Sequence, residues 1–114
     1  MARILLVEDY ELVLRYLCEA IHAAGHQADC VATKREAEAK LAAGRYDALC
    51  TNIRLPDGSG HELAIKASDL GIKVVLMTGH PDEVVALSIA EVAHLEKPFR
   101  AEELLHLIEH TLGA

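Results

Sequence analysis

Five short apolar runs alternate along the chain with longer segments in which apolar residues recur every three or four positions. The runs cover residues 4–7, 28–31, 48–51, 74–77 and 94–95. The first, third and fourth are apolar at nearly every position, as expected of strands that helices cover on both faces of a parallel sheet. We therefore expect these three strands at the centre of the sheet.

The segments between the runs carry helix signals. The first has apolar residues at helical spacing, namely Val13, Leu17, Ile21 and Ala24. Thr33 and Glu36 fit a capping box that opens a second helix, which ends at Gly44. Further helices are predicted over residues 60–70, 83–92 and 102–112. The alternation predicts a single α/β domain of (βα)5 type over residues 1–114, doubly wound around a five-stranded parallel sheet.

Composition and charge narrow the choice of partner. The 114 residues are 52% hydrophobic, which suits one domain with a sizeable core. The net charge is −7, and the Lys and Arg residues are scattered, which argues against nucleic acid or an anionic membrane surface as a direct partner. The first apolar run is too short for a signal peptide or a membrane helix.

The cysteines bear on the compartment. Cys18, Cys30 and Cys50 are odd in number, far apart and in no CxxC spacing. We therefore expect free core thiols in a reducing compartment, and a cytoplasmic location.

The residues at the carboxyl ends of the predicted strands are the first candidates for chemistry, because the ligand site of an open parallel α/β sheet lies beyond these ends. They are Glu8 and Asp9 after the first strand, Asn52 after the third, Thr78 after the fourth and Lys97 after the fifth. We expect these five side chains to converge in space.

Four separated motifs together make a family resemblance. They are the acidic pair Glu8-Asp9, the loop residues Leu55, Pro56 and Gly60, Thr78 followed by a small residue, and Lys97-Pro98-Phe99. Each piece alone is weak, but their joint order is specific. Over essentially its full length the chain resembles the receiver domain of bacterial two-component response regulators. The resemblance implies the flavodoxin-like strand order 2-1-3-4-5.

In that family an aspartate at the end of the third strand takes a phosphoryl group from a histidine kinase. The acidic pair, that aspartate and a backbone carbonyl two residues further on hold Mg²⁺. The resemblance carries these metal roles to Glu8, Asp9, Asn52 and the Arg54 carbonyl. It carries the binding of the phosphoryl oxygens to Thr78 and Lys97. The family's Lys-Pro peptide bond is usually cis.

Asn52 departs from this pattern, because a carboxamide has no anionic oxygen and cannot become an aspartyl phosphate. It also removes one negative charge, so we expect Mg²⁺ binding to be weakened rather than abolished. A natural loss of phosphorylation, an engineered substitution and a simple polar strand end all remain open. Thr51 should face the other side of the sheet, and turn chemistry alone explains Asp57, so neither is a convincing substitute acceptor.

A second departure lies three residues before Lys97. The family generally has Tyr or Phe there, as a rotamer switch coupled to the threonine, whereas this chain has His94. A histidine could still swing, and it titrates near neutral pH. Alternatively, His94 merely fills the position.

The leading hypothesis is a non-enzymatic signalling module that acts by binding a histidine kinase, a phosphotransfer protein or another regulator. In the family, the surface of the fourth helix, fifth strand and fifth helix carries output and often dimerisation. Here that surface contains Val84, Val85, Leu87, His94, Arg100 and Leu107. A homodimer through this surface is one expectation.

Two alternatives remain. In the first, the natural protein has Asp at position 52 and is an ordinary phosphoaccepting receiver. In the second, the chain is a flavin- or nucleotide-binding protein of flavodoxin-like fold. The second is remote, because Glu8 and Asp9 would repel phosphate and no glycine-rich phosphate loop occurs.

Overall fold

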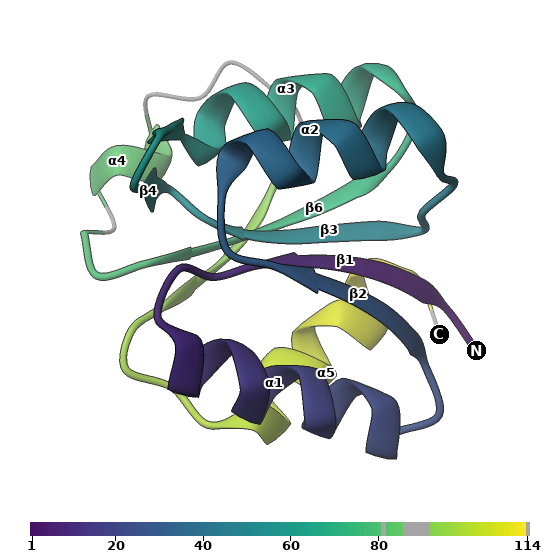
Figure 1. Cartoon of the computed structure of the whole chain (residues 1–114). Coiled ribbons are helices and arrows are strands. Elements are labelled where there is room, and N and C mark those ends of the chain that lie inside the picture. The colour runs from purple at the N-terminus through teal and green to yellow at the C-terminus, as the bar shows by residue number, and fades with distance from the viewer. Residues whose placement is uncertain (81, 86–91, 114) are drawn as a thin grey trace.

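The computed structural model describes residues 1–80, 82–85 and 92–113. Five parallel strands form one sheet in the order β2-β1-β3-β6-β7 (Figure 1). Their bounds are β1 Arg3–Val7, β2 Gln27–Val31, β3 Ala48–Asn52, β6 Lys73–Thr78 and β7 Ala93–Glu96. Counted along the five strands of this sheet, the order is 2-1-3-4-5. The predicted doubly wound parallel sheet is therefore confirmed.

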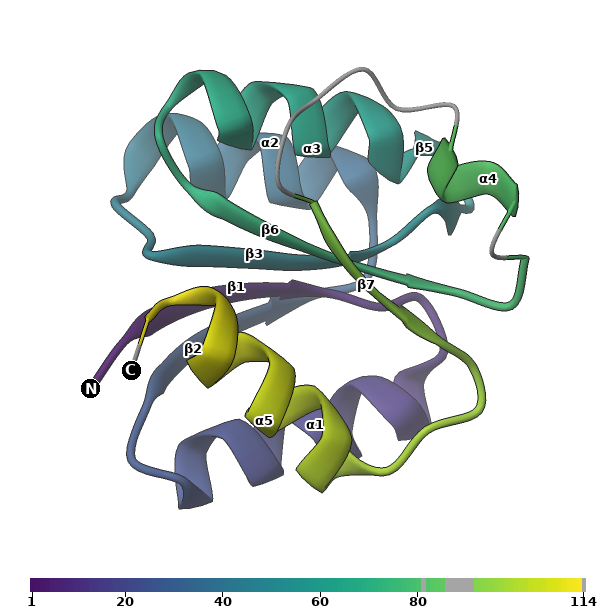
Figure 2. The same cartoon turned by 180° about the vertical axis from the view of Figure 1, so that it is seen from behind.

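Helices cover both faces of the sheet (Figure 2). Helices α1 (Glu11–Ala23) and α5 (Ala101–Thr111) lie on one face, and α2 (Lys34–Ala43) and α3 (Gly60–Asp69) lie on the other. Thr33 caps α2 as predicted, because its hydroxyl accepts a hydrogen bond from the backbone N–H of Glu36 at 3.1 Å. No helix among the described residues combines the length and apolar character that crossing a bilayer requires.

The fourth helix matches its prediction only in part. α4 is described over Asp82–Val85, one residue earlier than the predicted start. Residues 86–91 of the predicted helix lie outside the described residues. Val92, the predicted last residue, is described and is not helical.

Alternation along β1 explains why its sequence is apolar at every position. Ile4 and Leu6 pack in the core that α1 and α5 cover, whereas Leu5 and Val7 pack in the core that α2 and α3 cover. All four are fully buried. A central strand with two covered faces has no position left for a polar side chain until it reaches the edge of the sheet. Glu8 and Asp9 follow directly after the carboxyl end of β1.

A short antiparallel ribbon, which the sequence analysis does not predict, follows β3. It pairs β4 (Arg54–Leu55) with β5 (Gly58–Ser59) and leads directly into α3. Gly60 closes this turn, since its N–H donates to the carbonyl oxygen of Ile53 at 2.7 Å. A Cβ at Gly60 would collide with the backbone carbonyl oxygen of Asn52. Glycine is needed here so that the loop can press against the end of β3.

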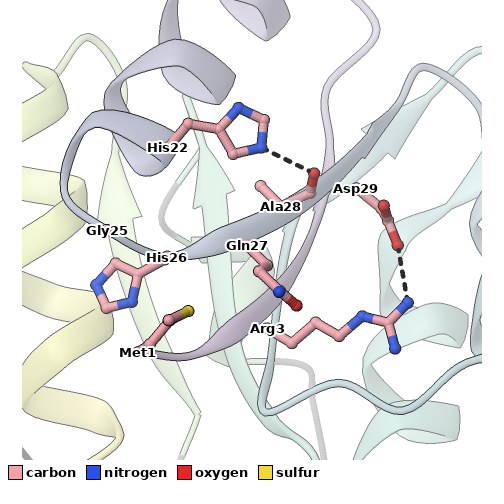
Figure 3. Close-up of a pocket in the computed structure, with 8 residues that line it drawn as sticks. All are labelled: Met1, Arg3, His22, Gly25, His26, Gln27, Ala28 and Asp29. Atoms are coloured by element: carbon pink, nitrogen blue, oxygen red, sulfur yellow. Dashed lines mark hydrogen bonds and ion pairs between the residues drawn. The ribbon is translucent and has the colours of Figure 1, made fainter.

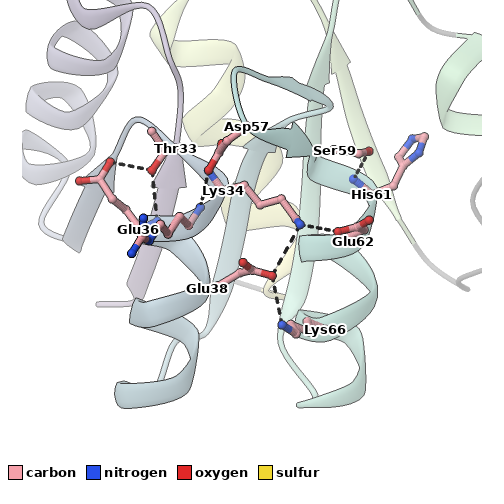
Figure 4. Close-up of polar contacts among 10 residues, drawn as sticks. Thr33, Lys34, Glu36, Glu38, Asp57, Ser59, His61, Glu62 and Lys66 are labelled. Atoms are coloured by element: carbon pink, nitrogen blue, oxygen red, sulfur yellow. Dashed lines mark hydrogen bonds and ion pairs between the residues drawn. The ribbon is translucent and has the colours of Figure 1, made fainter.

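Asp57, at the tip of this ribbon, caps a helix that is distant in sequence. Its carboxylate accepts the backbone N–H groups of Lys34 at 2.8 Å and Arg35 at 2.9 Å, at the start of α2 (Figure 4). The interpretation that turn chemistry alone explains Asp57 is therefore incomplete. The hydrogen bonds from Arg35 and Lys34 hold the pKa of Asp57 below its ordinary value. The loop after β3 is thus tied to α2.

A chain of ion pairs continues along α2 and α3 in the same view. The Lys34 ammonium contacts the carboxylates of Glu62 and Glu38, and Lys66 contacts Glu38 at 3.1 Å. The bond to Glu62 raises the pKa of Lys34 and lowers that of Glu62. Surface ion pairs of this kind each contribute little to stability.

The prediction of three free thiols is wrong for two of the cysteines. Cys18 in α1 and Cys30 in β2 form a disulfide with 6.3 Å between their Cα atoms. The pair is 12 residues apart, but α1 packs directly beside β2, which brings the two side chains together. Cys50 is free and buried as expected, and burial raises its pKa to about 12. The inference from free thiols to a reducing compartment therefore loses most of its basis.

Reduction of the disulfide should destabilise the domain. A cross-link over 12 residues restricts the unfolded chain by about 3 kcal/mol in the chain-entropy account. We expect urea unfolding of the wild type to shift to lower denaturant when a phosphine reductant is added. The double variant Cys18→Ala/Cys30→Ala should not respond to the reductant. A wild type that is equally stable in both conditions, with three alkylatable thiols after denaturation, would contradict the pairing.

Replacing Asp57 with Asn should lower the stability of the folded state in a pH-dependent way. The native pKa lies below the unfolded value of about 4, so the carboxylate contributes stability above about pH 4 that is lost as the pH falls through the native pKa. Urea unfolding should therefore show D57N less stable than wild type at neutral pH, with the difference shrinking at low pH. Asp69→Asn, at an exposed position in α3, is the matched control and should show no such loss. Equal stability of D57N and wild type at neutral pH would exclude the cap.

Candidate functional site

A small cavity of about 110 Å³ lies at the carboxyl ends of the central strands. The residues that line it are Asp9, Asn52, Arg54, Met77, Thr78, Gly79, His80 and Lys97. They come from the ends of or the loops after β1, β3, β6 and β7. The strand-end residues singled out from the sequence thus meet in one place. Glu8 does not line the cavity. It is fully buried and accepts a hydrogen bond from Asn52, which does line it.

Glu8 is the buried charge of the site, and three donors meet its carboxylate. Oε2 accepts the backbone N–H of Tyr10 at 2.9 Å and the side-chain amide of Asn52 at 2.8 Å. Oε1 accepts from the ammonium of Lys97 at 2.8 Å. A buried carboxylate is tolerable only with such partners, because its desolvation is costly. One side chain therefore joins the ends of β1, β3 and β7.

The carboxamide of Asn52 bridges the two acids. Its Nδ2 donates to Oε2 of Glu8 at 2.8 Å and to Oδ1 of Asp9 at 2.9 Å. Its Oδ1 is buried and accepts no hydrogen bond from any described residue. The side chain is almost wholly buried, at 4% exposure. The amide nitrogen, rather than the amide oxygen, faces the carboxylates.

Thr78 and Lys97 are engaged with their own surroundings. The buried Thr78 hydroxyl accepts the N–H of His80 at 2.9 Å and lies 3.2 Å from the His80 carbonyl, to which it can donate. Lys97 donates its backbone N–H to the Thr78 carbonyl at 2.7 Å, and its bond to Pro98 is cis. The sequence analysis does not identify His80 as a site residue. Its position two residues after the strand-end Thr78 is a signal that could have indicated it.

His94 and the Arg54 side chain point elsewhere. His94 sits on β7 opposite Leu76, is exposed, and does not line the cavity. The Arg54 guanidinium pairs with Glu83 of α4 at 3.3 Å. On the expected output surface, Arg100 is exposed like His94, and Leu107 is partly buried. Leu87 and the side chains of Val84 and Val85 lie outside what the structure describes.

The donor set as arranged does not fit Mg²⁺. Among the described residues no three His, Cys, Asp or Glu side chains gather as a metal site, and the third family ligand, Asn52, turns N–H groups toward the acids. To present Oδ1 to a cation, the amide would have to rotate and break both hydrogen bonds. Bonds to charged groups contribute about 1.5–3 kcal/mol each, so the rotation would oppose binding.

A larger hollow, of about 410 Å³, lies at the other end of the strands from this cavity (Figure 3). Several of its polar side chains are already paired: the His22 ring lies 3.1 Å from the carbonyl oxygen of Ala28, and Arg3 pairs with Asp29 at 3.6 Å. It is open and lies at the amino ends of β1 and β2. The strand-end cavity is smaller, but its convergent charged groups make it the better candidate.

Comparison with known proteins gives a consistent result. The sequence profile of the response regulator receiver domain matches residues 4–109. The transcriptional regulatory protein BasR of Escherichia coli is 36% identical over 90% of this chain and 48% of its own length. The swarming motility regulation protein RssB of Serratia marcescens is 33% identical over 93% of this chain and 51% of its own length. The chain thus spans about half the length of these curated relatives.

Solved structures agree on the fold. A CheY-like receiver domain protein from Methanospirillum hungatei is 30% identical and superposes with a TM-score of 0.89 over 99% of this chain and 94% of that one. The response regulator TrrA from Thermotoga maritima, solved in complex with Mg²⁺ and BeF, is 28% identical, with a TM-score of 0.84 over 97% and 99% of the two chains. The chain belongs to the response regulator receiver domain family of two-component signalling.

Proposed function

We propose that this receiver acts by binding other signalling proteins and that, as written, it does not accept a phosphoryl group. The observation that carries the proposal is the place of Asn52, at the end of β3 between Glu8 and Asp9 and beside the cavity that Thr78 and Lys97 line. This is where a family member would have its acceptor aspartate. A carboxamide there has no anionic oxygen with which to attack phosphorus.

The neighbouring groups support the same proposal. Phosphoryl transfer depends on positive charge and donors placed around the moving group. Here Lys97 is paired with Glu8, and the Thr78 hydroxyl is bonded to the loop that contains His80. We take Glu8, Asp9, Asn52 and the Arg54 carbonyl as the remnant of the family's Mg²⁺ site, and we expect it to bind the ion so weakly that millimolar Mg²⁺ leaves it empty. Thr78 and His94 remain the proposed switch positions.

An ordinary phosphoaccepting receiver, in which Asn52 stands in place of a natural aspartate, is the second candidate. The observation that favours it is the completeness of the pocket around position 52. The acidic pair, Thr78 and Lys97 are all present and converge. A flavin or nucleotide site is disfavoured, because Glu8 and Asp9 would repel a phosphate beside them.

The proposed partners are a histidine kinase, a phosphotransfer protein or another regulator, with a homodimer through the α4-β7-α5 surface as a further option. The net charge of −7 argues against nucleic acid and anionic membranes. Treating residues 1–114 as one receiver domain agrees with the profile match over 4–109. A cytoplasmic location stays in the proposal, although the Cys18–Cys30 disulfide removes the thiol argument for it.

Offering acetyl phosphate in the presence of Mg²⁺ tests the proposal. We expect intact-mass spectrometry to show no added phosphate on the wild type, because Asn52 cannot form an acyl phosphate. Asn52→Asp should gain one phosphate that hydroxylamine removes, and Asn52→Asp/Lys97→Ala should gain it more slowly because a charge next to the transferring group is lost. A phosphate on the wild-type chain would refute the proposal. If N52D also fails to gain one while remaining folded, the second candidate is excluded.

A further inference from the structure

We infer that the carboxamide of Asn52 takes the place of a divalent cation in this pocket, so that the acidic pair keeps one arrangement without Mg²⁺. The inference rests on the proposed function in one respect: Asn52 is taken as the residue with which the protein works. It concerns the resting state of the site rather than phosphoryl transfer.

Charge balance is the first argument. One nitrogen atom lies within 2.8 Å of a Glu8 oxygen and 2.9 Å of an Asp9 oxygen, so the two carboxylates are brought close together. Glu8 is fully buried, and a second negative charge beside it increases the need for compensation. Lys97 compensates Glu8 from one side. The two N–H bonds of the Asn52 amide supply the rest, where a cation would otherwise be needed.

The orientation of the amide is the second argument. Its buried Oδ1 has no donor among the described residues, so no described contact on the oxygen side holds the amide in place. The reverse orientation would put that oxygen against two carboxylate oxygens, which is repulsive unless a cation lies between them. The hydrogen-bonded bridge and a bound cation therefore exclude each other. Without a cation, the two carboxylates favour the orientation in which the amide N–H groups face them.

The contrast with aspartate at the same position is the third argument. Asp at position 52 would place three carboxylates at one site and remove both donors. Such a pocket would depend on a cation for stability. The wild-type pocket should not, since its groups satisfy one another.

The chain offers a direct measurement, because Asn52 and Gln27 carry its only two side-chain carboxamides. In a ¹⁵N-labelled sample of the full chain, the Asn52 NH₂ protons should exchange with water about tenfold more slowly than those of the exposed Gln27, the factor that corresponds to one net hydrogen bond. Millimolar MgCl₂ should leave the Asn52 signals in place, relative to NaCl of equal ionic strength. Exchange as fast as that of Gln27, or a saturable shift with MgCl₂, would overturn the inference.

Two variants sharpen the test. Asp9→Ala, at an exposed position, removes one acceptor and should speed the exchange of the Asn52 NH₂ protons; unchanged exchange would contradict the bridge. Asn52→Asp should bind Mg²⁺ at least about tenfold more tightly than wild type, seen as a rise in melting temperature with MgCl₂. Similar responses of the two proteins would overturn the inference.

Failure here and failure of the proposed function are distinguishable. A wild type that binds Mg²⁺ but refuses acetyl phosphate defeats the cation-substitute idea alone. A wild type that accepts phosphate defeats the proposed function, whatever its response to MgCl₂.

Discussion

The buried carboxylate of Glu8 is the constraint on which the site depends. It is fully buried, so its charge must be met by protein groups, and its three donors come from the turn after β1, the end of β3 and the end of β7. Two of these strands lie beside each other in the sheet, whereas β7 is at its far edge. Lys97 therefore reaches across the strand ends to meet Glu8, and it lines the cavity together with Asn52.

The loop after β3 packs against the backbone of Asn52, which is the partner of Glu8 on β3. Gly60 lets the β4–β5 ribbon lie against the carbonyl of Asn52, and Asp57 at the tip of the ribbon caps α2. The side chain that bridges the acids thus stands at the end of a fully buried strand and in front of a loop that a second helix secures.

The sequence was sufficient for the five-stranded sheet and for the strand-end residues of the cavity, although it missed the β4–β5 ribbon and His80. Fully apolar runs require two covered faces, and parallel strands bring their carboxyl ends to one edge. It was insufficient for contacts between segments whose spacing in the chain carries no signal. The Cys18–Cys30 disulfide and the cap from Asp57 to α2 are of this kind. Each depends on tertiary placement that no local pattern encodes.

The hydrogen bonds of Asn52 to Glu8 and Asp9 are also contacts that the sequence did not predict. From the sequence, Asn52 is a missing nucleophile and a missing charge. In the structure the same replacement supplies two N–H donors to the acids beside it. The missing carboxylate oxygen and the two added donors are therefore one chemical difference, because the amide nitrogen stands where a carboxylate would have its second oxygen. Among the described residues, protein donors alone therefore meet the charge of the buried Glu8 carboxylate.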